Sequence, residues 1–213
     1  MTKKYYINEL PNILPIFPLP GAVLLPQGTL PLNIFEPRYV SMVEKVLGGD
    51  RFIGMIQPFS GNLKEKDKLY PVGCAGKIMS FTETNDNRFL IELEGVIRFK
   101  IKTECEEVDG YRNIVPEWKT YANDLEVSKE ELDISALLAE LKLYFKKTNI
   151  NVDYEELSKV SSQHIIASVP QICSFKENEK QAVLEANTYY DRMKVLISLL
   201  KMYSTSNESE SIN

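Results

Sequence analysis

The pattern of apolar and polar positions over the first 120 residues is that of short β-strands joined by turns. In residues 97–102, apolar and basic residues alternate, which predicts a strand with one buried face. Two apolar stretches, 70–84 and 88–94, flank the sequence NDN and predict an antiparallel hairpin. Gly95 predicts a bulge or bend, and Asp109-Gly110 a second tight turn. This spacing favours a small barrel or a folded sheet.

The segment from residue 13 to residue 47 is apolar and is interrupted by prolines. Residues before proline prefer extended conformations, and proline cannot donate a hydrogen bond to a neighbouring strand. We therefore expect residues 13–18 to form an edge strand or to lie at a rim, with a second strand over 29–35. Pro37 suits the first position of a helix, which we expect to end at the double glycine after Leu47.

The apolar period changes to that of helices near residue 120. Three helices are expected, over 128–149, 153–172 and 176–203, and the first opens with a capping box of Ser128 and Glu131. Short loops between them predict a bundle. The predicted fold class is therefore α+β, with a β-rich subdomain over 1–120 that contains one short helix and a helical bundle over 121–204. Residues 205–213 are small, polar and acidic, and are expected to be disordered.

Composition and charge narrow the possible functions. The chain has 213 residues, 44% of them hydrophobic and 26% charged, as is typical of a globular protein. Its net charge of -5 weighs against a general nucleic-acid binder and against electrostatic attachment to anionic lipid. We find no apolar run long enough for a signal peptide or a membrane span, so we expect no membrane association and a cytoplasmic location.

Cysteine and histidine give little basis for a metal or catalytic site. Cys74, Cys105 and Cys173 lie far apart without metal-ligand spacing, and are interpreted as reduced core residues of a cytosolic protein. The single histidine, His164, lies among apolar helix positions, which favours a structural role over a catalytic triad. We predict no metal, no cofactor and no catalytic residue.

Two stretches resemble a known family. LPIFPLPGAVLLPQGTLPLNIFEPRYVSMVEKVL, at 14–47, is similar to the opening of the amino-terminal substrate-binding domain of Lon proteases, and residues 174–200 are similar to its later helical part. The resemblance implies a PUA-like pseudo-barrel followed by a helical bundle. The chain contains no G-x-x-x-x-G-K-[ST] motif and ends after the last predicted helix. We therefore expect a free-standing, non-enzymatic member without the ATPase and peptidase domains.

Five residues are candidates for binding a peptide: Phe35, Arg38, Tyr39, Trp118 and Tyr121. In one interpretation of FEPRY, Arg38 anchors a carboxylate or a backbone carbonyl between the two aromatic rings. In the alternative, Glu36 caps the helix and pairs with Arg38. Trp118 and Tyr121 either line a groove beside the helical part or fill the joint between the subdomains.

The family resemblance implies a module that binds exposed or unfolded polypeptide. Main-chain hydrogen bonds to a sheet edge would supply the affinity. An adaptor or self-associating scaffold, an RNA-binding module and an uncharacterised hydrolase stay open as alternatives, although the acidic balance makes RNA the less favoured partner. The sequence does not fix the oligomeric state.

Overall fold

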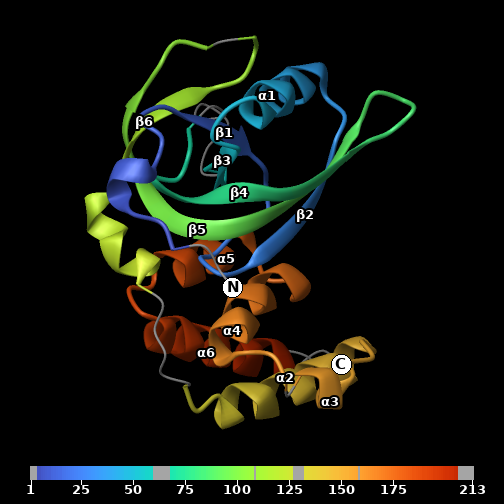
Figure 1. The fold of residues 1–213 in the computed structure, drawn as a ribbon. Coiled ribbons are helices and arrows are strands. Elements are labelled where there is room, and N and C mark those ends of the chain that lie inside the picture. Colours follow the sequence, from blue (N-terminus) through green and yellow to red (C-terminus); the bar gives the residue numbers. More distant parts are fainter. Residues whose placement is uncertain (1–3, 60–67, 108, 127–131, 158, 206–213) are drawn as a thin grey trace. The chain divides into compact units, whose positions relative to one another are not determined.

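The computed structural model describes residues 4–59, 68–107, 109–126, 132–157 and 159–205 (Figure 1). The chain divides into two compact units, Met1–Val127 and Ser128–Asn213. The first contains the six strands found among these residues, the helix α1 (Pro37–Leu47), and the short 3-10 helices η1 (Ile7–Glu9) and η2 (Lys119–Leu125). The second contains the helices α2 to α6.

Strands of the first unit close a ring, and one further strand extends it. They are β1 (Leu14–Pro18), β2 (Thr29–Ile34), β3 (Phe52–Ile56), β4 (Val72–Glu83), β5 (Phe89–Glu104) and β6 (Asn113–Glu117). Their order is β2-β5-β4-β3-β1-β6, and β6 also pairs with β5. Five strands therefore close a small barrel, and β2 extends the sheet beside the first half of β5 (Figure 1). The predicted hairpin is confirmed as β4 and β5.

Residues 13–18 were expected to form an edge strand or to lie at a rim, and the first alternative is wrong, because β1 has neighbours on both sides. Ile16, Phe17 and Pro18 pair with the parallel strand β3, and Leu14 and Pro15 pair with the antiparallel strand β6. Each proline of β1 pairs with only one neighbour, so the missing N–H groups cost the barrel little. Among the described residues, the strand that pairs on one side only is β2, which contains Pro31.

β5 contains a bulge between the half that pairs with β2 and the half that closes the barrel. The register shifts between Ala75 and Gly76 of β4, which pair with Ile97 and Gly95 of β5. This confirms the irregularity predicted at Gly95. A Cβ atom at Gly95 would lie only 2.0 Å from the carbonyl oxygen of Leu25, so the chain before β2 can approach this closely only because residue 95 is glycine.

The helix predicted at Pro37 is confirmed as α1. Pro37 occupies the first turn, where its missing N–H would have no partner within the helix. The buried residues of α1 are Tyr39, Met42 and Val43, which lie on one face at helical spacing. η2 belongs to the first unit and packs against β5.

The second unit contains more and shorter helices than its periodicity predicts. They are α2 (Ser135–Thr148), α3 (Tyr154–Leu157), α4 (Ser162–Ile172), α5 (Glu177–Glu185) and α6 (Tyr189–Thr205), and α6 packs against α2, α4 and α5. The helix expected over 153–172 is broken because Ser161 caps α4, its hydroxyl accepting from His164 N–H at 3.3 Å. The helix expected over 176–203 is broken before α6, where the Thr188 hydroxyl accepts from the Asp191 N–H at 3.1 Å.

The helix predicted to begin at Ser128 begins at Ser135 instead. Asp133 accepts a hydrogen bond from the Ser135 N–H at 3.0 Å, next to the N-cap residue Ile134, which makes no side-chain cap. The predicted capping box of Ser128 and Glu131 lies outside the described residues, as do residues 206–213 of the predicted tail, whereas Thr205 ends α6. The α+β fold class is confirmed. No helix among the described residues is long and apolar enough to span a membrane.

Candidate peptide-binding pocket

A pocket of about 530 Å³ lies in the first unit, where the end of β1, the start of α1 and the turn between β5 and β6 meet. Its apolar lining consists of three prolines, one leucine and two tyrosines: Pro18, Pro20, Pro58, Leu69, Tyr39 and Tyr111. Its charged lining consists of two arginines and two glutamates: Arg38, Arg112, Glu104 and Glu107. The pocket therefore offers an apolar surface together with both hydrogen-bond donors and acceptors.

Tyr39 joins the apolar part of the pocket to its charged part. Its ring packs against Phe17 of β1 with centroids 4.2 Å apart, and the guanidinium of Arg38 lies 4.6 Å from the ring centroid. Burial of the ring raises the pKa of Tyr39, partly offset by the positive charge of Arg38. The hydroxyl is therefore neutral at physiological pH and can donate a hydrogen bond to a ligand.

The two arginines of the pocket are each held by a carboxylate. Arg38 donates from Nη2 to Glu36 Oε2 at 2.8 Å, and this hydrogen bond raises the pKa of Arg38. Arg112 donates from Nη2 to Glu104 Oε2. Of the two alternatives for FEPRY, the structure contains the Glu36–Arg38 pair but no side-chain cap from Glu36. The pair is exposed, so it leaves Arg38 accessible to a ligand.

The turn predicted at Asp109-Gly110 shapes one side of the pocket. Both residues have left-handed backbone conformations, with φ of 53° and 78°. The left-handed φ at position 110 favours glycine, whereas an added Cβ atom would make only an ordinary van der Waals contact, 3.4 Å from Cβ of Arg38 at the start of α1. The next residues along the chain, Tyr111 and Arg112, consequently line the pocket.

The structure brings Arg38 and Tyr39 together in the pocket but not the other three candidates. Phe35 is 62% exposed outside it, with the guanidinium of Arg88 6.0 Å from its ring. Trp118 and Tyr121 are buried side chains, each 8% exposed.

The two buried aromatic residues contact other residues of the first unit. Trp118 donates from Nε1 to the Pro11 carbonyl at 3.3 Å and packs edge-on against Phe99 of β5. Tyr121 lies 4.2 Å from the guanidinium of Arg98. Both side chains therefore fix η2 and the N-terminal segment to the barrel.

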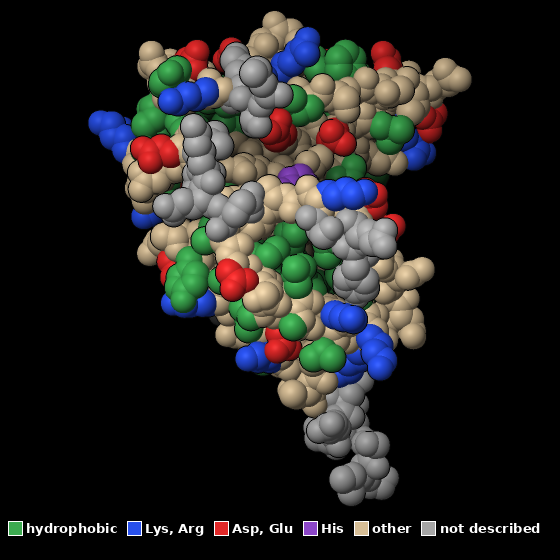
Figure 2. All heavy atoms as spheres, turned by 60° about the horizontal axis from the view of Figure 1, so that its bottom comes forward, with side chains coloured by type: hydrophobic (Ala, Val, Ile, Leu, Met, Phe, Trp, Pro, Cys, Tyr) green, Lys and Arg blue, Asp and Glu red, His purple; other side chains and the backbone are tan. Residues whose placement is uncertain are grey.

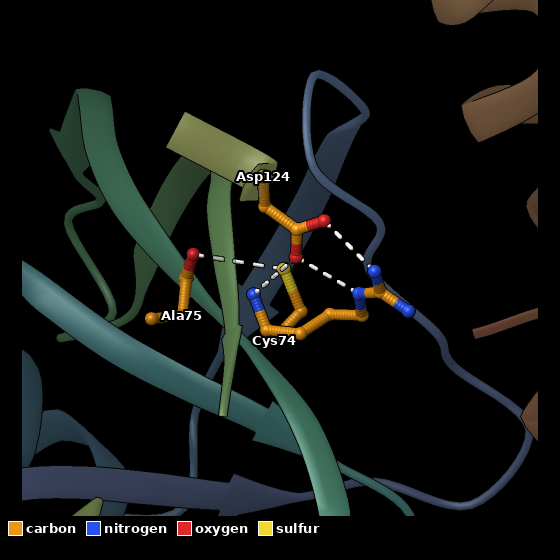
Figure 3. Close-up of polar contacts among 4 residues, drawn as sticks. Cys74, Ala75 and Asp124 are labelled. Carbon is orange, nitrogen blue, oxygen red and sulfur yellow. Dashed lines mark hydrogen bonds and ion pairs between the residues drawn. The ribbon is translucent and has the colours of Figure 1, made fainter. Parts of the chain in front are cut away.

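Among the described residues of the first unit, the most enclosed ion pair joins Arg98 of β5 to Asp124 of η2 (Figure 3). The guanidinium donates from Nε and Nη2 to the two carboxylate oxygens, both at 2.8 Å, and the side chains are 3% and 6% exposed. Figure 3 also shows the thiol of Cys74 directed at the Ala75 carbonyl, 3.7 Å away. The alternation over 97–102 predicted a strand, but it assigned Arg98 to the solvent face, and this is wrong: the partner Asp124 keeps Arg98 inside.

The sequence did not identify most of the pocket lining. Pro18, Pro58, Glu104, Tyr111 and Arg112 come from several separate segments, and only the Asp109-Gly110 turn indicated that the residues after it double back.

A second cavity of about 360 Å³ lies between the start of β1, the end of α1 and the start of β6. It shares Tyr111 with the pocket. Among the described residues, no group of three or more histidine, cysteine, aspartate or glutamate side chains is placed to hold a metal ion.

The barrel followed by a helical bundle defines a two-part α+β domain, and comparison with known proteins gives its family. The model of the ATP-dependent protease La (LON) substrate-binding domain matches residues 13–202. The chain therefore belongs to this family, which confirms the resemblance found in its sequence. The matched region is the substrate-binding domain and not the ATPase or protease domain.

Several relatives are similar over much of this chain. Lon protease 2 of Myxococcus xanthus is 24% identical over 199 residues, which are 91% of this chain and 24% of that protein. Lon protease of Desulfosudis oleivorans is 26% identical over 157 residues, 72% of this chain and 17% of that protein. The chain thus spans less than a quarter of the length of these relatives.

Solved structures show the same fold. The Lon N-terminal domain protein of Xanthomonas campestris has a TM-score of 0.62 at 21% identity, covering 87% of this chain and 97% of its own. The N-terminal domain of the Mycobacterium avium complex Lon protease has a TM-score of 0.62 at 12% identity, covering 89% and 98%.

Proposed function

We propose that the chain is a non-enzymatic module that binds exposed or unfolded polypeptide segments in the cytoplasm. The observation that carries this proposal is the family match over residues 13–202, because a protease substrate-binding domain takes polypeptide as its ligand. The chemistry of the pocket agrees with such a ligand. Backbone amides offer both donors and acceptors, and the pocket offers arginine, tyrosine and glutamate groups that can bind both.

Arg38 and Tyr39 are the residues we propose to contact the polypeptide. The guanidinium and the phenol hydroxyl are donors for backbone carbonyls, while the prolines pack against apolar side chains. Because ordering a flexible chain offsets much of the contact energy, we expect an affinity on the order of micromolar for a single segment.

The test is a fluorescence-anisotropy titration with a labelled, reduced and carboxymethylated protein that stays unfolded. We expect saturable binding, and a Kd about 5-fold to 10-fold higher for Arg38→Gln, in line with the loss of a charge-assisted hydrogen bond. Lys119→Gln, which removes an exposed cation outside the pocket, is the matched control and should bind normally. Absence of binding would refute the module, and an unchanged Kd for Arg38→Gln would refute the role of the pocket.

The alternatives lack comparable support. On the face drawn in Figure 2, the described basic and acidic side chains are interspersed, which is not the basic field expected of an RNA-binding surface. A hydrolase would degrade casein with or without ATP, and we expect no cleavage. A self-associating scaffold would show a concentration-dependent mass by light scattering, whereas a binding module does not require one.

A further inference from the structure

The last five residues of β4, Met79–Glu83, form an exposed strand end with an unpaired side. β4 pairs with β3 only from Cys74 to Lys77, and beyond them Ile78 N–H donates to the Arg51 carbonyl at 2.9 Å. After this bond, none of the described strands lies on that side of β4. All five residues are exposed, and none of them lines the pocket.

The backbone groups on this side are directed outward. At the end of the hairpin, Thr84 N–H donates to the Arg88 carbonyl at 2.9 Å. Alternate residues of an antiparallel pair direct their N–H and C=O groups to the same side, so Ser80 and Thr82 face β5. Phe81 and Glu83 therefore present their N–H and C=O groups on the unpaired side of β4.

The strand β2, which pairs with β5 alone among the described strands, differs from this end of β4. Gly95 N–H donates to the Gly28 carbonyl at 2.8 Å, and the same alternation directs Pro31 away from β5. Proline has no N–H, so the middle of this edge lacks a donor. Residues 79–83 contain no proline and keep every donor.

The side chains of the β4 edge define what can bind beside it. Met79 and Phe81 are 54% and 47% exposed, which offers apolar contact to a neighbouring strand. Glu83 follows two residues after Phe81, hence on the same face of the strand. It forms no ion pair with any described residue, so a cation placed opposite it gains a partner.

We propose that the edge Met79–Glu83 binds an extended polypeptide as an added β-strand, and that it selects an apolar residue followed or preceded two positions away by lysine or arginine. The apolar side chain packs against Phe81 and the cation pairs with Glu83. This inference rests on the proposed function, since the ligand is again polypeptide, and it adds the bound conformation and the chemistry of the selected residues.

The first test uses short peptides that carry this pattern and leaves the protein unchanged. Two versions are N-methylated at alternate amides, one at the amides that face β4 and the other at the amides that face solvent. We expect one version to bind at least about 10-fold more weakly than the parent peptide, because it loses several hydrogen bonds, and the other to bind normally. Equal binding of both versions would overturn the proposal.

The second test exchanges charge at the edge. Glu83→Lys should weaken binding of the lysine peptide about 5-fold and strengthen binding of the matched glutamate peptide, as expected for a cross-strand ion pair. Glu44→Lys changes the net charge equally at an exposed position of α1 and should leave both affinities unchanged. The same response from both variants would show a general charge effect and refute a contact at Glu83.

These outcomes separate the edge from the pocket. If unfolded protein binds in an Arg38-dependent manner but the peptides do not bind, the edge proposal fails and the proposed function stands. If neither ligand binds, both fail. Light scattering of the chain alone identifies a competing occupant: self-association that Glu83→Lys abolishes would mean that a second copy occupies the edge, which would also overturn the proposal.

Discussion

Arg98 and Asp124 are joined by two parallel hydrogen bonds inside the first unit, and Asp124 also accepts from the Arg98 N–H at 3.1 Å. One carboxylate thus holds both the side chain and the backbone of a β5 residue. Since Asp124 belongs to η2, this contact anchors the segment that follows β6 to the barrel. Each charge depends on the other, because both side chains are almost fully buried and water can replace neither partner effectively.

Removal of one partner should be costly. Asp124→Asn leaves the Arg98 charge buried, and we expect the free energy of unfolding to fall by about 3 kcal/mol in urea denaturation. The double variant Arg98→Met/Asp124→Leu should recover most of this loss, because no charge is left buried. Glu156→Gln breaks the exposed Glu156–Lys159 pair and should cause no measurable change. Equal stability of Asp124→Asn and the wild type would contradict this role.

Gly95→Ala should destabilise the first unit by at least about 2 kcal/mol, since its Cβ atom would overlap the Leu25 carbonyl and force the backbone apart. Gly48 provides the matched control. It ends α1 with a right-handed conformation, and its Cβ atom would lie 3.6 Å from the Lys45 carbonyl. Gly48→Ala should therefore be neutral or slightly stabilising. Thermal unfolding followed by circular dichroism distinguishes the two variants, and similar midpoints would contradict the close approach.

The three cysteines should differ in reactivity. Burial raises the pKa of Cys173 to about 12, so this thiol stays protonated and unreactive at neutral pH. Cys74 is fully buried, whereas Cys105 is partly exposed and lines the second cavity, so the prediction that all three are core residues is wrong for Cys105. Treatment of the folded protein with a thiol reagent should modify Cys105 alone, and denaturant should make all three react. Mass spectrometry of the digested protein identifies the modified residue; early labelling of Cys173 would refute this packing.

Ionisation of Tyr203 should lower the free energy of unfolding at alkaline pH. Burial, together with the hydrogen bond from its hydroxyl to Glu179, raises the pKa of Tyr203 to about 12 from an ordinary value of 10.0. The neutral phenol is therefore favoured in the folded state, and its contribution is complete below about pH 10 and lost as the pH rises towards 12. Tyr203→Phe should be less stable near pH 8 and should lose less stability between pH 8 and pH 11. Urea denaturation of both proteins at the two pH values is the measurement. The same difference in free energy of unfolding between wild type and variant at pH 8 and pH 11 would contradict this linkage.

Local signals predicted the local parts of the fold. The NDN turn, the Asp109-Gly110 turn and the start of α1 each depend on a few adjacent residues, and the structure confirms them. The position of β1 within the barrel depends on β6, about 100 residues later, and no local pattern contains that information. The helix breaks at Ser161 and Thr188 were missed for the opposite reason, because apolar periodicity continues across a residue whose hydroxyl caps a new helix.

Of the candidate site, too, only the part formed by adjacent residues was predictable. Arg38 and Tyr39 are adjacent in a helix start that the sequence identified, and the structure places both in one pocket. Glu104 and Arg112 reach the same pocket only because β5 and β6 pair. The Arg98–Asp124 pair was missed because alternation assigns a basic residue to solvent unless its buried partner is known.

The closure of the barrel also has a consequence for how the chain folds. β1 comes first in the ring, yet it requires partners at residues 54–56 and at residues 113–114. During synthesis, β1 must therefore wait, with its β6-facing side unsatisfied, until nearly the whole first unit has left the ribosome. Contacts so distant in sequence slow folding and prolong the exposure of apolar strands. We therefore expect closure of β1 against β6 to be a late step of folding, before which this unit is most prone to aggregation.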